Sequence, residues 1–349
     1  MKIYIVSLSF LVPRKRKLLG IDIGTAAIKI VELERGKTNR LANYVYFHNK
    51  NKDDSFYFNS FQVDTSYIVN VIRAMLDKSS IVTTEAFMSI PVAFSFSTIF
   101  SLPIIKKEEM NSAINFEARK FIPVPMDEVY VNWNAIDFMS SKQGVKILMI
   151  AVPKETINKY NAIARALRLQ LRGLEIESFS LVRSLVDQDE KECAAVIDIG
   201  EYITNICITE QDVVSVHHTS NVSGRALTNR IASMLSVSVD RANTLKNEQG
   251  LNQYHQLHEL LAPLINKMIN EVVKSNDSHT INGGTTMQKV ILSGGSSHIP
   301  GLQEYLNRTL NIPVVRGDEF GRVTFPDVLE KTIHKQPVDF SVALGLAMK

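Results

Sequence analysis

The sequence is poor in several features that mark other classes of protein. Its 349 residues include two cysteines, Cys193 and Cys207, whose spacing does not match a zinc-binding motif. We therefore expect buried, reduced thiols and not a disulfide framework. No stretch approaches the roughly 20 consecutive apolar residues that span a bilayer, and no segment is of low complexity. What remains is an ordinary globular composition in a chain long enough for two sizeable cores.

An excess of basic residues is confined to a short segment. The formal net charge is +3, but residues 1–17 hold five basic residues and no acid, so residues 18–349 alone carry −2. A body without a basic stripe is not expected to bind nucleic acid. We interpret residues 1–17 as a basic and apolar leader that is disordered or loosely docked. A contact with a membrane surface and a start site placed too far upstream stay open as alternatives.

The most informative feature that is present is a tetrapeptide that occurs twice. Ile-Asp-Ile-Gly spans residues 21–24 and again residues 197–200, and each copy ends an apolar run. A small or polar turn follows each copy, and then a second β-rich run, at 27–33 and at 204–209. The two aspartates stand at positions 22 and 198, 176 residues apart. Two such strand–turn–strand units predict two similar lobes that face one ligand.

The remaining residues predict how the chain is divided. Residues 93–153 combine strand-like runs with one amphipathic helix, a compact α+β pattern. Further on, we expect a helix over 257–274 and a polar loop over 275–286. The predicted division is a leader at 1–17, a first lobe at 18–92 and 154–190, an inserted α+β subdomain at 93–153, a second lobe at 191–221 and 287–349, and a helical nucleotide-side subdomain at 222–286.

The turns after the two strands carry chemistry that suits a phosphate. A strand that ends in Asp-x-Gly places a carboxylate at its C-terminal end, where open α/β sheets bind ligands. Asp22 and Asp198 would hold Mg²⁺ there through water, because Mg²⁺ keeps several waters and takes few carboxylates. Gly24 and Gly200 let the backbone approach a phosphate closely. A single Asp-x-Gly is usually a plain β-turn, whereas two copies in matching context favour a phosphate site.

A third segment completes the pattern. Residues 290–297, Val-Ile-Leu-Ser-Gly-Gly-Ser-Ser, run from a predicted strand through two glycines toward a helix. Such a segment offers a flat backbone surface against which a purine and a ribose can lie. Taken alone, it could be any tight turn between a strand and a helix.

With these three pieces in this order, the chain resembles the actin-like ATPase superfamily, which includes actin, the large heat-shock chaperones and the sugar kinases. Within it, the chain resembles the PilM family of type IV pilus assembly proteins, and next the cell-division protein FtsA. The likeness to PilM rests on residues 16–34, 116–129, 174–183 and 224–250 and covers 18–349. The implied fold class is α/β, an actin-like ATPase of two RNase H-like lobes with a small α+β subdomain inserted into the first lobe.

The resemblance implies ATP and Mg²⁺ as cofactors and a place for each matching residue. The expected cofactor-binding residues are Asp22, Gly24, Thr25, Ala26 and Lys29 in the first phosphate turn, Asp198, Gly200 and Thr204 in the second, Gly224 beside the phosphates or ribose, Asn243 and Lys246 at the ribose and adenine, and Gly294, Gly295 and Ser296 on the adenine face. The two aspartates are the expected metal ligands, through water. Glu177 would take the place of the glutamate that orients water in bacterial actins. A solvated or capping carboxylate is the alternative reading of Glu177, and Glu175 is its rival for the role.

Three departures from the family pattern bear on hydrolysis. Glu201 directly follows Gly200, where a small residue is usual, so a carboxylate stands near the expected γ-phosphate. Asn243 stands where related proteins often have a glutamate. Ala26 and Ala27 leave fewer hydroxyls in the first turn than a Ser/Thr-rich version would. Together they favour ATP binding with weak or no ATPase activity.

The resemblance also implies a partner and a location. The expected function is an ATP-binding scaffold of type IV pilus assembly, cytoplasmic and peripheral to the inner membrane. It would dock the N-terminal cytoplasmic peptide of a PilN-like inner-membrane protein, in a groove between the first lobe and the inserted subdomain. Phe121, Ile122 and Val124 are candidates to line that groove. Pilus motor ATPases and other copies of this chain are further partners to consider.

Two other functions stay open. A small-molecule kinase of the same superfamily would need a substrate pocket and a positioned base near the γ-phosphate, and the sequence offers only Glu177 for that base. An FtsA-like cytoskeletal protein would be expected to carry a C-terminal amphipathic membrane helix, and this sequence stops at Lys349, directly after the apolar residues 343–347. The scaffold is therefore the favoured reading.

Overall fold

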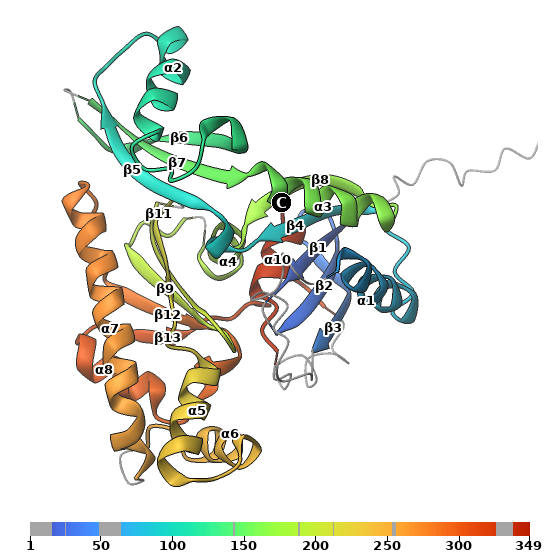
Figure 1. The fold of residues 1–349 in the computed structure, drawn as a ribbon, viewed down its shortest axis with the longest axis vertical. Helices are drawn as coiled ribbons and strands as arrows, with labels where there is room; N and C mark the ends of the chain where they lie inside the picture. The colour runs from blue at the N-terminus through green and yellow to red at the C-terminus, as the bar shows by residue number, and fades with distance from the viewer. Residues whose placement is uncertain are drawn as a thin grey trace, which may run out of the picture.

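The computed structural model of the chain describes residues 16–24, 26–48, 64–141, 144–187, 189–211, 213–252, 256–325 and 338–349. Thr25 and residues 1–15 of the predicted leader lie outside the described residues. Within these ranges the strands form two five-stranded sheets and one three-stranded sheet, with helices packed around them (Figure 1).

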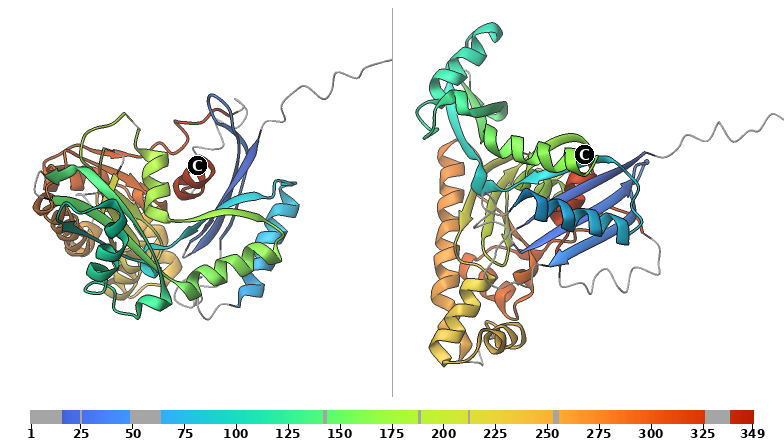
Figure 2. Two further views of the ribbon diagram at one scale, coloured as in Figure 1. Left: turned by 90° about the horizontal axis from the view of Figure 1, so that it is seen from above. Right: turned by 45° about the vertical axis from the view of Figure 1, so that its right-hand side comes forward.

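The first sheet begins with the first Ile-Asp-Ile-Gly strand. Its strand order is β3-β2-β1-β4-β8, in which β3, β2 and β1 are antiparallel neighbours and β4 and β8 run parallel to β1. Helices α1 and α3 lie side by side against this sheet (Figure 2). Ile72 of α1 and Ile163 of α3 are buried in the same cluster as Ile21 and Ile30 of the strands. The bounds are β1 Lys17–Ile23, β2 Ala27–Glu34, β3 Arg40–His48, β4 Glu85–Ile90, β8 Gln170–Ile176, α1 Thr65–Lys78 and α3 Lys154–Ala166.

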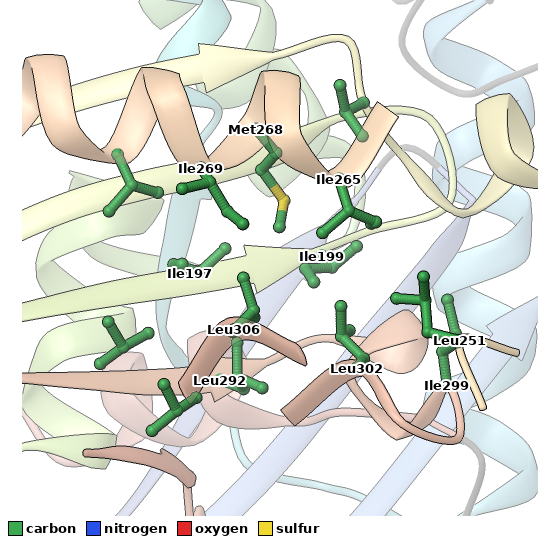
Figure 3. Packing of buried hydrophobic residues seen from close by; sticks show 14 of the residues in the cluster. Ile197, Ile199, Leu251, Ile265, Met268, Ile269, Leu292, Ile299, Leu302 and Leu306 are labelled. Carbon is green, nitrogen blue, oxygen red and sulfur yellow. The ribbon is translucent and has the colours of Figure 1, made fainter. Parts of the chain in front are cut away.

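The second sheet repeats the plan of the first. Its order is β11-β10-β9-β12-β13, again with three antiparallel strands followed by two parallel ones. The bounds are β9 Ala194–Ile199, β10 Thr204–Glu210, β11 Val213–Ser220, β12 Lys289–Ser293, β13 Val314–Arg316, α5 Gly224–Leu235, α6 Val239–Glu248, α7 Leu257–Ile281, η4 Gly295–His298 and α8 Leu302–Leu310. Figure 3 shows Ile265 and Met268 of α7 packed against Ile197 and Ile199 of β9. The shared order confirms that one α/β lobe is duplicated.

A small α+β unit lies between β4 and β8 in the chain. Its sheet has the order β5-β7-β6 and is antiparallel throughout. Helix α2 packs on one face of this sheet, where Ile114 and Ala118 are buried with Ile147 and Met149 of β7. The bounds are η2 Val92–Phe94, β5 Phe96–Leu102, α2 Lys107–Ala118, η3 Met126–Glu128, β6 Val129–Ser141 and β7 Gly144–Pro153. We call these elements from β5 to β7 the inserted subdomain.

Helix α7 is longer than the sequence predicts. The prediction of a loop over 275–286 is wrong, because the helix continues to Ile281. Ser275, Asn276 and His279 are polar, yet all three are buried, and α7 packs against β10 and β11. The segment has the polar composition of a surface loop. In the fold, however, these polar side chains are buried and have partners inside the protein, so the segment is helical.

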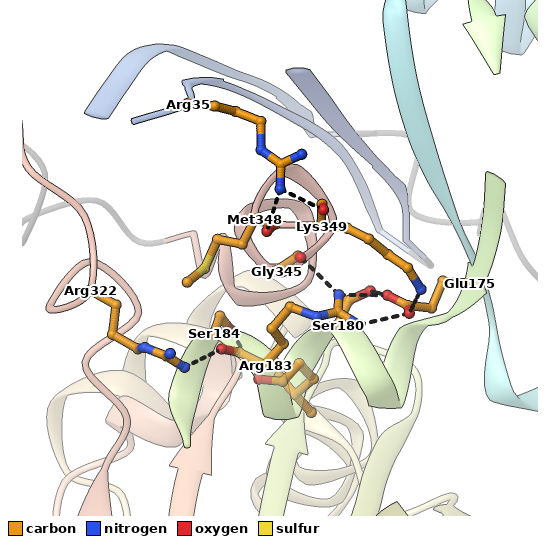
Figure 4. Close-up of polar contacts among 10 residues, drawn as sticks. Arg35, Glu175, Ser180, Arg183, Ser184, Arg322, Gly345, Met348 and Lys349 are labelled. Carbon is orange, nitrogen blue, oxygen red and sulfur yellow. Dashed lines mark hydrogen bonds and ion pairs between the residues drawn. The ribbon is translucent and has the colours of Figure 1, made fainter. Parts of the chain in front are cut away.

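Two short helices, α4 (Glu177–Leu185) and α10 (Ser341–Ala347), lie between the two large sheets. Although the prediction groups residues 287–349 with the second lobe, α10 packs against β1, β2 and β4 of the first sheet and against α4. Arg183 of α4 donates to the carbonyl oxygen of Gly345 at 2.9 Å and to Glu175 Oε2 at 2.7 Å (Figure 4). Across the described part of the chain, every helix is too short or too polar to span a bilayer.

Candidate functional site

A cavity of about 520 Å³ lies between the two large sheets, where both Ile-Asp-Ile-Gly turns end. Its wall is built from both lobes and from α4, α6 and η4. The predicted residues found on this wall are Asp22, Gly24, Ala26, Lys29, Glu177, Asp198, Gly200, Asn243, Lys246, Gly294, Gly295 and Ser296. The three sequence segments therefore meet around one space.

The first turn presents Asp22 at the end of β1. This carboxylate is 3% exposed, and its Oδ1 accepts a hydrogen bond of 2.8 Å from Ser89 Oγ of β4. Lys29 lies opposite Asp22 in the register of β1 and β2, and its Nζ is 3.6 Å from Asp22 Oδ2. The backbone N–H of Gly24 donates to the carbonyl of Ala27 at 2.9 Å, which closes the turn.

The second turn presents Asp198 at the end of β9. Asn205 lies opposite it in the register of β9 and β10, and the Asn205 side chain acts against burial by lowering the pKa of both Asp198 and Glu177. Burial, with Asp339 nearby, raises the pKa of Asp198 to about 7. The backbone of Gly294 passes so close, at a φ of 85°, that a Cβ there would lie 2.4 Å from Asp198 Oδ1. Only glycine fits beside this carboxylate.

Lys29 is a half-buried cation held by acids from both lobes. Although burial lowers its pKa, Asp22, Asp339 and Asp198 together raise it above the usual value. The ammonium of Lys29 therefore stays charged and compensates several carboxylates at once.

Asp339 is a wall residue that the sequence analysis missed. Its Oδ2 accepts from Ser293 Oγ at 2.6 Å and from the backbone N–H of Gly294 at 2.7 Å. Burial opposes ionisation here, but Lys29 and these hydrogen bonds lower the pKa of Asp339 to about 2. Burial and Asp339 raise the pKa of the neighbouring Glu319 well above its usual value. Asp339 is therefore the member of this acid pair that ionises more readily.

Glu177 stands at the first residue of α4 and is 8% exposed. Its Oε1 accepts from the backbone N–H of Val92 at 2.9 Å. Burial, with Asp22 nearby, raises the pKa of Glu177 to about 8, so its carboxyl is mostly protonated at neutral pH. The rival, Glu175, is not among the cavity residues, since Ser180, Arg183 and Lys349 bind its carboxylate (Figure 4).

The side of the cavity near α6 holds the predicted ribose and adenine residues. Asn243 and Lys246 are on the wall, and Lys246 Nζ donates to the carbonyl of Gly224 at 3.2 Å and to Thr228 Oγ1 at 3.0 Å. Gly224 itself is behind Ser296, because a Cβ on it would lie 2.2 Å from Ser296 Oγ. Gly224 thus shapes the wall without being part of it.

Thr204 is not where the resemblance places it. Its buried hydroxyl donates to the carbonyl of Val222 at 2.6 Å and is not among the groups that line the cavity. Side chains alternate along a strand, so the neighbouring Asn205 faces the cavity instead. The Asn205 Oδ1 atom is buried and has no hydrogen-bond partner among the described residues.

Glu201, which directly follows Gly200 in the second turn, lies on the cavity wall beside His48 and Arg225. Its carboxylate oxygens lie 3.8 Å from His48 Nε2 of β3 and 3.9 Å from an Arg225 nitrogen of α5. The neighbouring His48, against the effect of burial, lowers the pKa of Glu201, so it is ionised. Because β3 belongs to the first sheet, the contact with His48 joins the two lobes.

The sequence gives little indication of the cavity residues that were not predicted. Asn205 could have been found by pairing β9 with β10, because it lies opposite Asp198. His48 and Asp339 carry no motif, since their positions depend on how distant segments pack.

Of the three residues expected to line a peptide groove, one is exposed and two pack into the inserted subdomain. Ile122 is buried and Val124 packs against the same cluster beneath α2, whereas Phe121 is 44% exposed and stacks on Phe100 with 5.8 Å between ring centroids. The turn after α2 folds these side chains onto the inserted subdomain. On strand β6, Tyr130 is 54% exposed, and the ammonium of Lys154 at the start of α3 lies over its ring.

Comparisons with known proteins agree with this architecture. A family model described as type IV pilus assembly protein PilM matches residues 20–349. The chain is similar to a solved structure described as a PilM-PilN type IV pilus biogenesis complex, with 19% identity and a TM-score of 0.80, over 96% of this chain and 98% of that one. It is similar to the ethanolamine utilization protein EutJ from Carboxydothermus hydrogenoformans, with 17% identity and a TM-score of 0.57, over 97% and 90% of the two chains.

A third similar structure is MreB5 of Spiroplasma citri bound to AMPPNP, with 12% identity and a TM-score of 0.54, over 93% of this chain and 98% of that one. At such identities the likeness shows the fold, and it confirms the predicted actin-like ATPase fold.

Proposed function

The chain belongs to the PilM family of type IV pilus assembly proteins, and we propose that it is a nucleotide-binding scaffold that docks the cytoplasmic tail of a PilN-like inner-membrane protein. In this role it works in the cytoplasm, at the inner membrane, through its partner. The observation that carries the proposal is the cavity in which both aspartate turns and the Gly294-Gly295 segment meet.

The donor set of the cavity fits a nucleotide with a divalent cation. Asp22, Asp198 and Asp339 make the wall acidic, with Lys29 as the central cation, so an unaccompanied polyphosphate would be repelled. Asp22 and Asp198 would hold Mg²⁺ through water, and the cation would supply the positive charge that the phosphates need. The orphaned Asn205 Oδ1 is an acceptor that a metal-bound water would satisfy.

The other wall residues divide between the two ends of ATP. Gly24, Gly200 and Lys29 would contact the phosphates, and the adenosine would lie between α6 and η4. The wall residues that would contact the adenosine are Asn243, Lys246, Gly294, Gly295 and Ser296.

The protonation of Glu177 favours a nucleotide that stays bound and is hydrolysed slowly. A general base must accept a proton from the attacking water, and its pKa has to leave it ionised at the working pH. Without nucleotide and Mg²⁺, a pKa of about 8 leaves only a minority of Glu177 side chains ionised at neutral pH, which limits the rate at which this residue can act as that base. We propose ATP binding with slow hydrolysis, in which the nucleotide favours one arrangement of the lobes.

One contact links the cavity to the inserted subdomain. Glu177 lines the cavity and accepts from Val92 N–H, and Ala93 of the same short helix η2 is also on the wall. Strand β5 of the inserted subdomain begins at Phe96, directly after η2. A ligand that moves Glu177 therefore acts on the point where the chain enters the inserted subdomain.

Tyr130 marks the place proposed for the partner peptide. It lies on β6 with Lys154 Nζ 5.5 Å from its ring centroid, at the junction of the inserted subdomain and the first lobe. An exposed aromatic ring beside a cation offers an apolar anchor and a charge to an extended peptide.

Peptide binding with and without MgATP tests this function. The N-terminal cytoplasmic peptide of the PilN-like partner is titrated into the full chain by calorimetry. We expect binding that weakens at least about tenfold in Tyr130→Ala, and that is retained in Phe116→Ala, a matched change of an aromatic that is 67% exposed on α2. No binding in either nucleotide state would remove the scaffold function, and ATP-dependent phosphorylation of a small molecule would replace it with a kinase.

A further inference from the structure

Three buried groups that can bind a metal meet inside the second lobe, away from the cavity. They are Cys193, directly before β9, Glu210 at the end of β10 and His279 in the last turn of α7. Their ligand atoms all lie within 4.8 Å of one another, and His279 Nε2 is 2.9 Å from Glu210 Oε2. None of the three lines the nucleotide cavity.

Further contacts hold two of these groups in place. Ser215 Oγ lies 2.6 Å from His279 Nδ1, so the other ring nitrogen, Nε2, faces Glu210. The backbone N–H and hydroxyl of Thr285 donate to Glu210 at 3.0 and 2.7 Å. Gly284 lies against the ring, since a Cβ there would be 2.1 Å from His279 Nε2. Hydrogen bonds that fix the ring and the carboxylate are what metal-binding histidines and carboxylates have behind them.

Two proton arrangements satisfy the contacts of His279. In one, Ser215 donates to Nδ1, and Nε2–H donates to Glu210. In the other, Nδ1–H donates to Ser215, whose own proton goes to the carbonyl of Ile208 at 3.2 Å. The second arrangement turns the bare lone pair of Nε2 toward a carboxylate oxygen, which is favourable only if a cation binds both.

We propose that Cys193, Glu210 and His279 form a binding site for a divalent metal ion of the Zn²⁺ class. Thiolate, imidazole and carboxylate are the donors that Zn²⁺ takes in proteins. Tetrahedral bonds of about 2.0–2.3 Å bring ligand atoms to about 3.5 Å from one another, so the observed separations need adjustments of about 1 Å. Two anionic ligands and a divalent cation sum to zero, which removes the cost of an uncompensated charge in this buried place.

The ion is expected to stabilise one corner of the second lobe. The described residues supply three ligands, which leaves the fourth position of a tetrahedral ion to water or a backbone carbonyl. The site joins the end of α7 to the start of β9 and the end of β10. Three residues beyond His279, Asn282 Oδ1 accepts from Lys146 Nζ of the inserted subdomain at 3.4 Å. The ion therefore fixes the end of the helix that the inserted subdomain contacts.

Binding must release one proton. A cysteine thiol keeps its proton at neutral pH and binds a metal ion only as the thiolate. When Sγ bonds the ion, the thiol proton passes to the solvent, while His279 and Glu210 bind in their unprotonated forms. The affinity is therefore expected to rise about tenfold per pH unit near neutral pH.

Titration of the metal-free full chain with Zn²⁺, and with Co²⁺ as a spectroscopic probe, tests the site. We expect one ion per chain and a thiolate-to-cobalt absorption band. Cys193→Ser should abolish the band and weaken binding at least about 100-fold, and Ser215→Ala should weaken it about tenfold. Cys207→Ser is the matched control, because Cys207 is also a buried free thiol, but outside this cluster.

The wild-type spectrum alone can overturn the proposal, even if a variant fails to fold. No uptake by the folded wild type, or a cobalt spectrum without a thiolate band, would show that the three groups form a hydrogen-bond cluster only. A band that persists in Cys193→Ser would show that the metal binds elsewhere.

Discussion

The two Ile-Asp-Ile-Gly turns occupy equivalent places in two sheets of the same strand order, and their carboxylates have different surroundings. Asp22 is paired with Lys29 and accepts a hydrogen bond from Ser89. Asp198 faces the Asn205 amide in the register position that Lys29 occupies in the first lobe. The first carboxylate is therefore paired directly with a cation. The second is half-buried next to a neutral group and further acids, and Lys29 acts on it without a direct ion pair.

The two lobes therefore share one strand order but differ in the charged and polar groups around their aspartates. The first turn supplies the fixed charges of the site, Lys29 and Asp22. The second supplies a carboxyl whose pKa is about 7 and an unsatisfied acceptor on Asn205. A bound divalent cation would compensate the charge of Asp198 much more than that of Asp22, which already pairs with Lys29. Binding of a nucleotide with its cation is therefore expected to stabilise the second lobe more than the first.

Removal of Lys29 should have the largest effect, because this one cation serves both turns. In Lys29→Met, Asp22, Asp198 and Asp339 lose their compensating charge, and we expect the free energy of unfolding to fall by about 3–5 kcal/mol at pH 8. The loss should be smaller at pH 5, since carboxylates without a cation take up protons as the pH falls. Denaturant unfolding at both pH values measures it.

The matched control for Lys29 is Lys17→Met. Lys17 also pairs with a carboxylate, Glu32 at 3.2 Å, but its side chain is 40% exposed. Glu32 is buried, but Asn43 and Thr83 also donate to its carboxylate. We therefore expect a loss of about 1–2 kcal/mol, smaller than that of Lys29→Met. Equal losses in the two variants would show that Lys29 is not shared by the two turns.

The same substitution in the two aspartates should change stability in opposite directions. Asp22→Asn breaks the pair with Lys29 and should destabilise the nucleotide-free protein by about 1–3 kcal/mol at pH 8. The folded-state pKa of Asp198 is about 7, above its ordinary value of 3.8, so this carboxyl lowers stability as the pH rises from about 4 to 7. Asp198→Asn removes that loss and should stabilise the protein at pH 8 by about 1–4 kcal/mol.

Both aspartate variants should nevertheless lose MgATP binding, which calorimetry measures. Unfolding at pH 8 without nucleotide gives the stability of each. Stability changes of the same sign would mean that the two turns are electrostatically alike after all.

The sequence predicted the part of this comparison that is local and failed for the part that is not. Each strand, its aspartate and its glycine belong to one tetrapeptide, so the two turns and the duplicated fold could be predicted. Ser89, His48 and Asp339 reach the site from segments that only the tertiary fold brings near. Thr204 was misplaced because the family motif gives a residue type and not the face of the strand. The division into domains at the predicted bounds stays a prediction.

The protonation of Glu177 can be tested against Glu175, two residues earlier. Burial raises the pKa of Glu177 to about 8, so its contribution to stability is present at low pH and is lost as the pH rises from about 4.5 through 8. Glu177→Gln should therefore raise stability by about 1–2 kcal/mol at pH 6 and by about 3–5 kcal/mol at pH 9. Unfolding at the two pH values measures the difference.

Glu175→Gln is the control with the opposite expectation. Burial opposes the ionisation of Glu175, but Arg183 and Lys349 lower its pKa, so it is ionised and paired at both pH values. Its variant should be destabilised at pH 6 and at pH 9. A loss of stability in Glu177→Gln at pH 9 would contradict a protonated Glu177 and would restore it as a candidate general base.

The smallest effect is expected where the two turns differ most in sequence. Glu201 holds the position that Thr25 holds in the first turn, and Glu201→Thr makes the second turn match the first. The Glu201 side chain is 37% exposed and its ion pairs span 3.8 and 3.9 Å, so stability should change by less than about 0.5 kcal/mol. The carboxylate faces His48 and Arg225, so MgATP affinity should rise only about threefold, and less at high salt. Calorimetry at two salt concentrations measures this. A gain of tenfold or more would place the carboxylate against the phosphates, and a loss of affinity would mean that the contact between the lobes helps to hold the nucleotide.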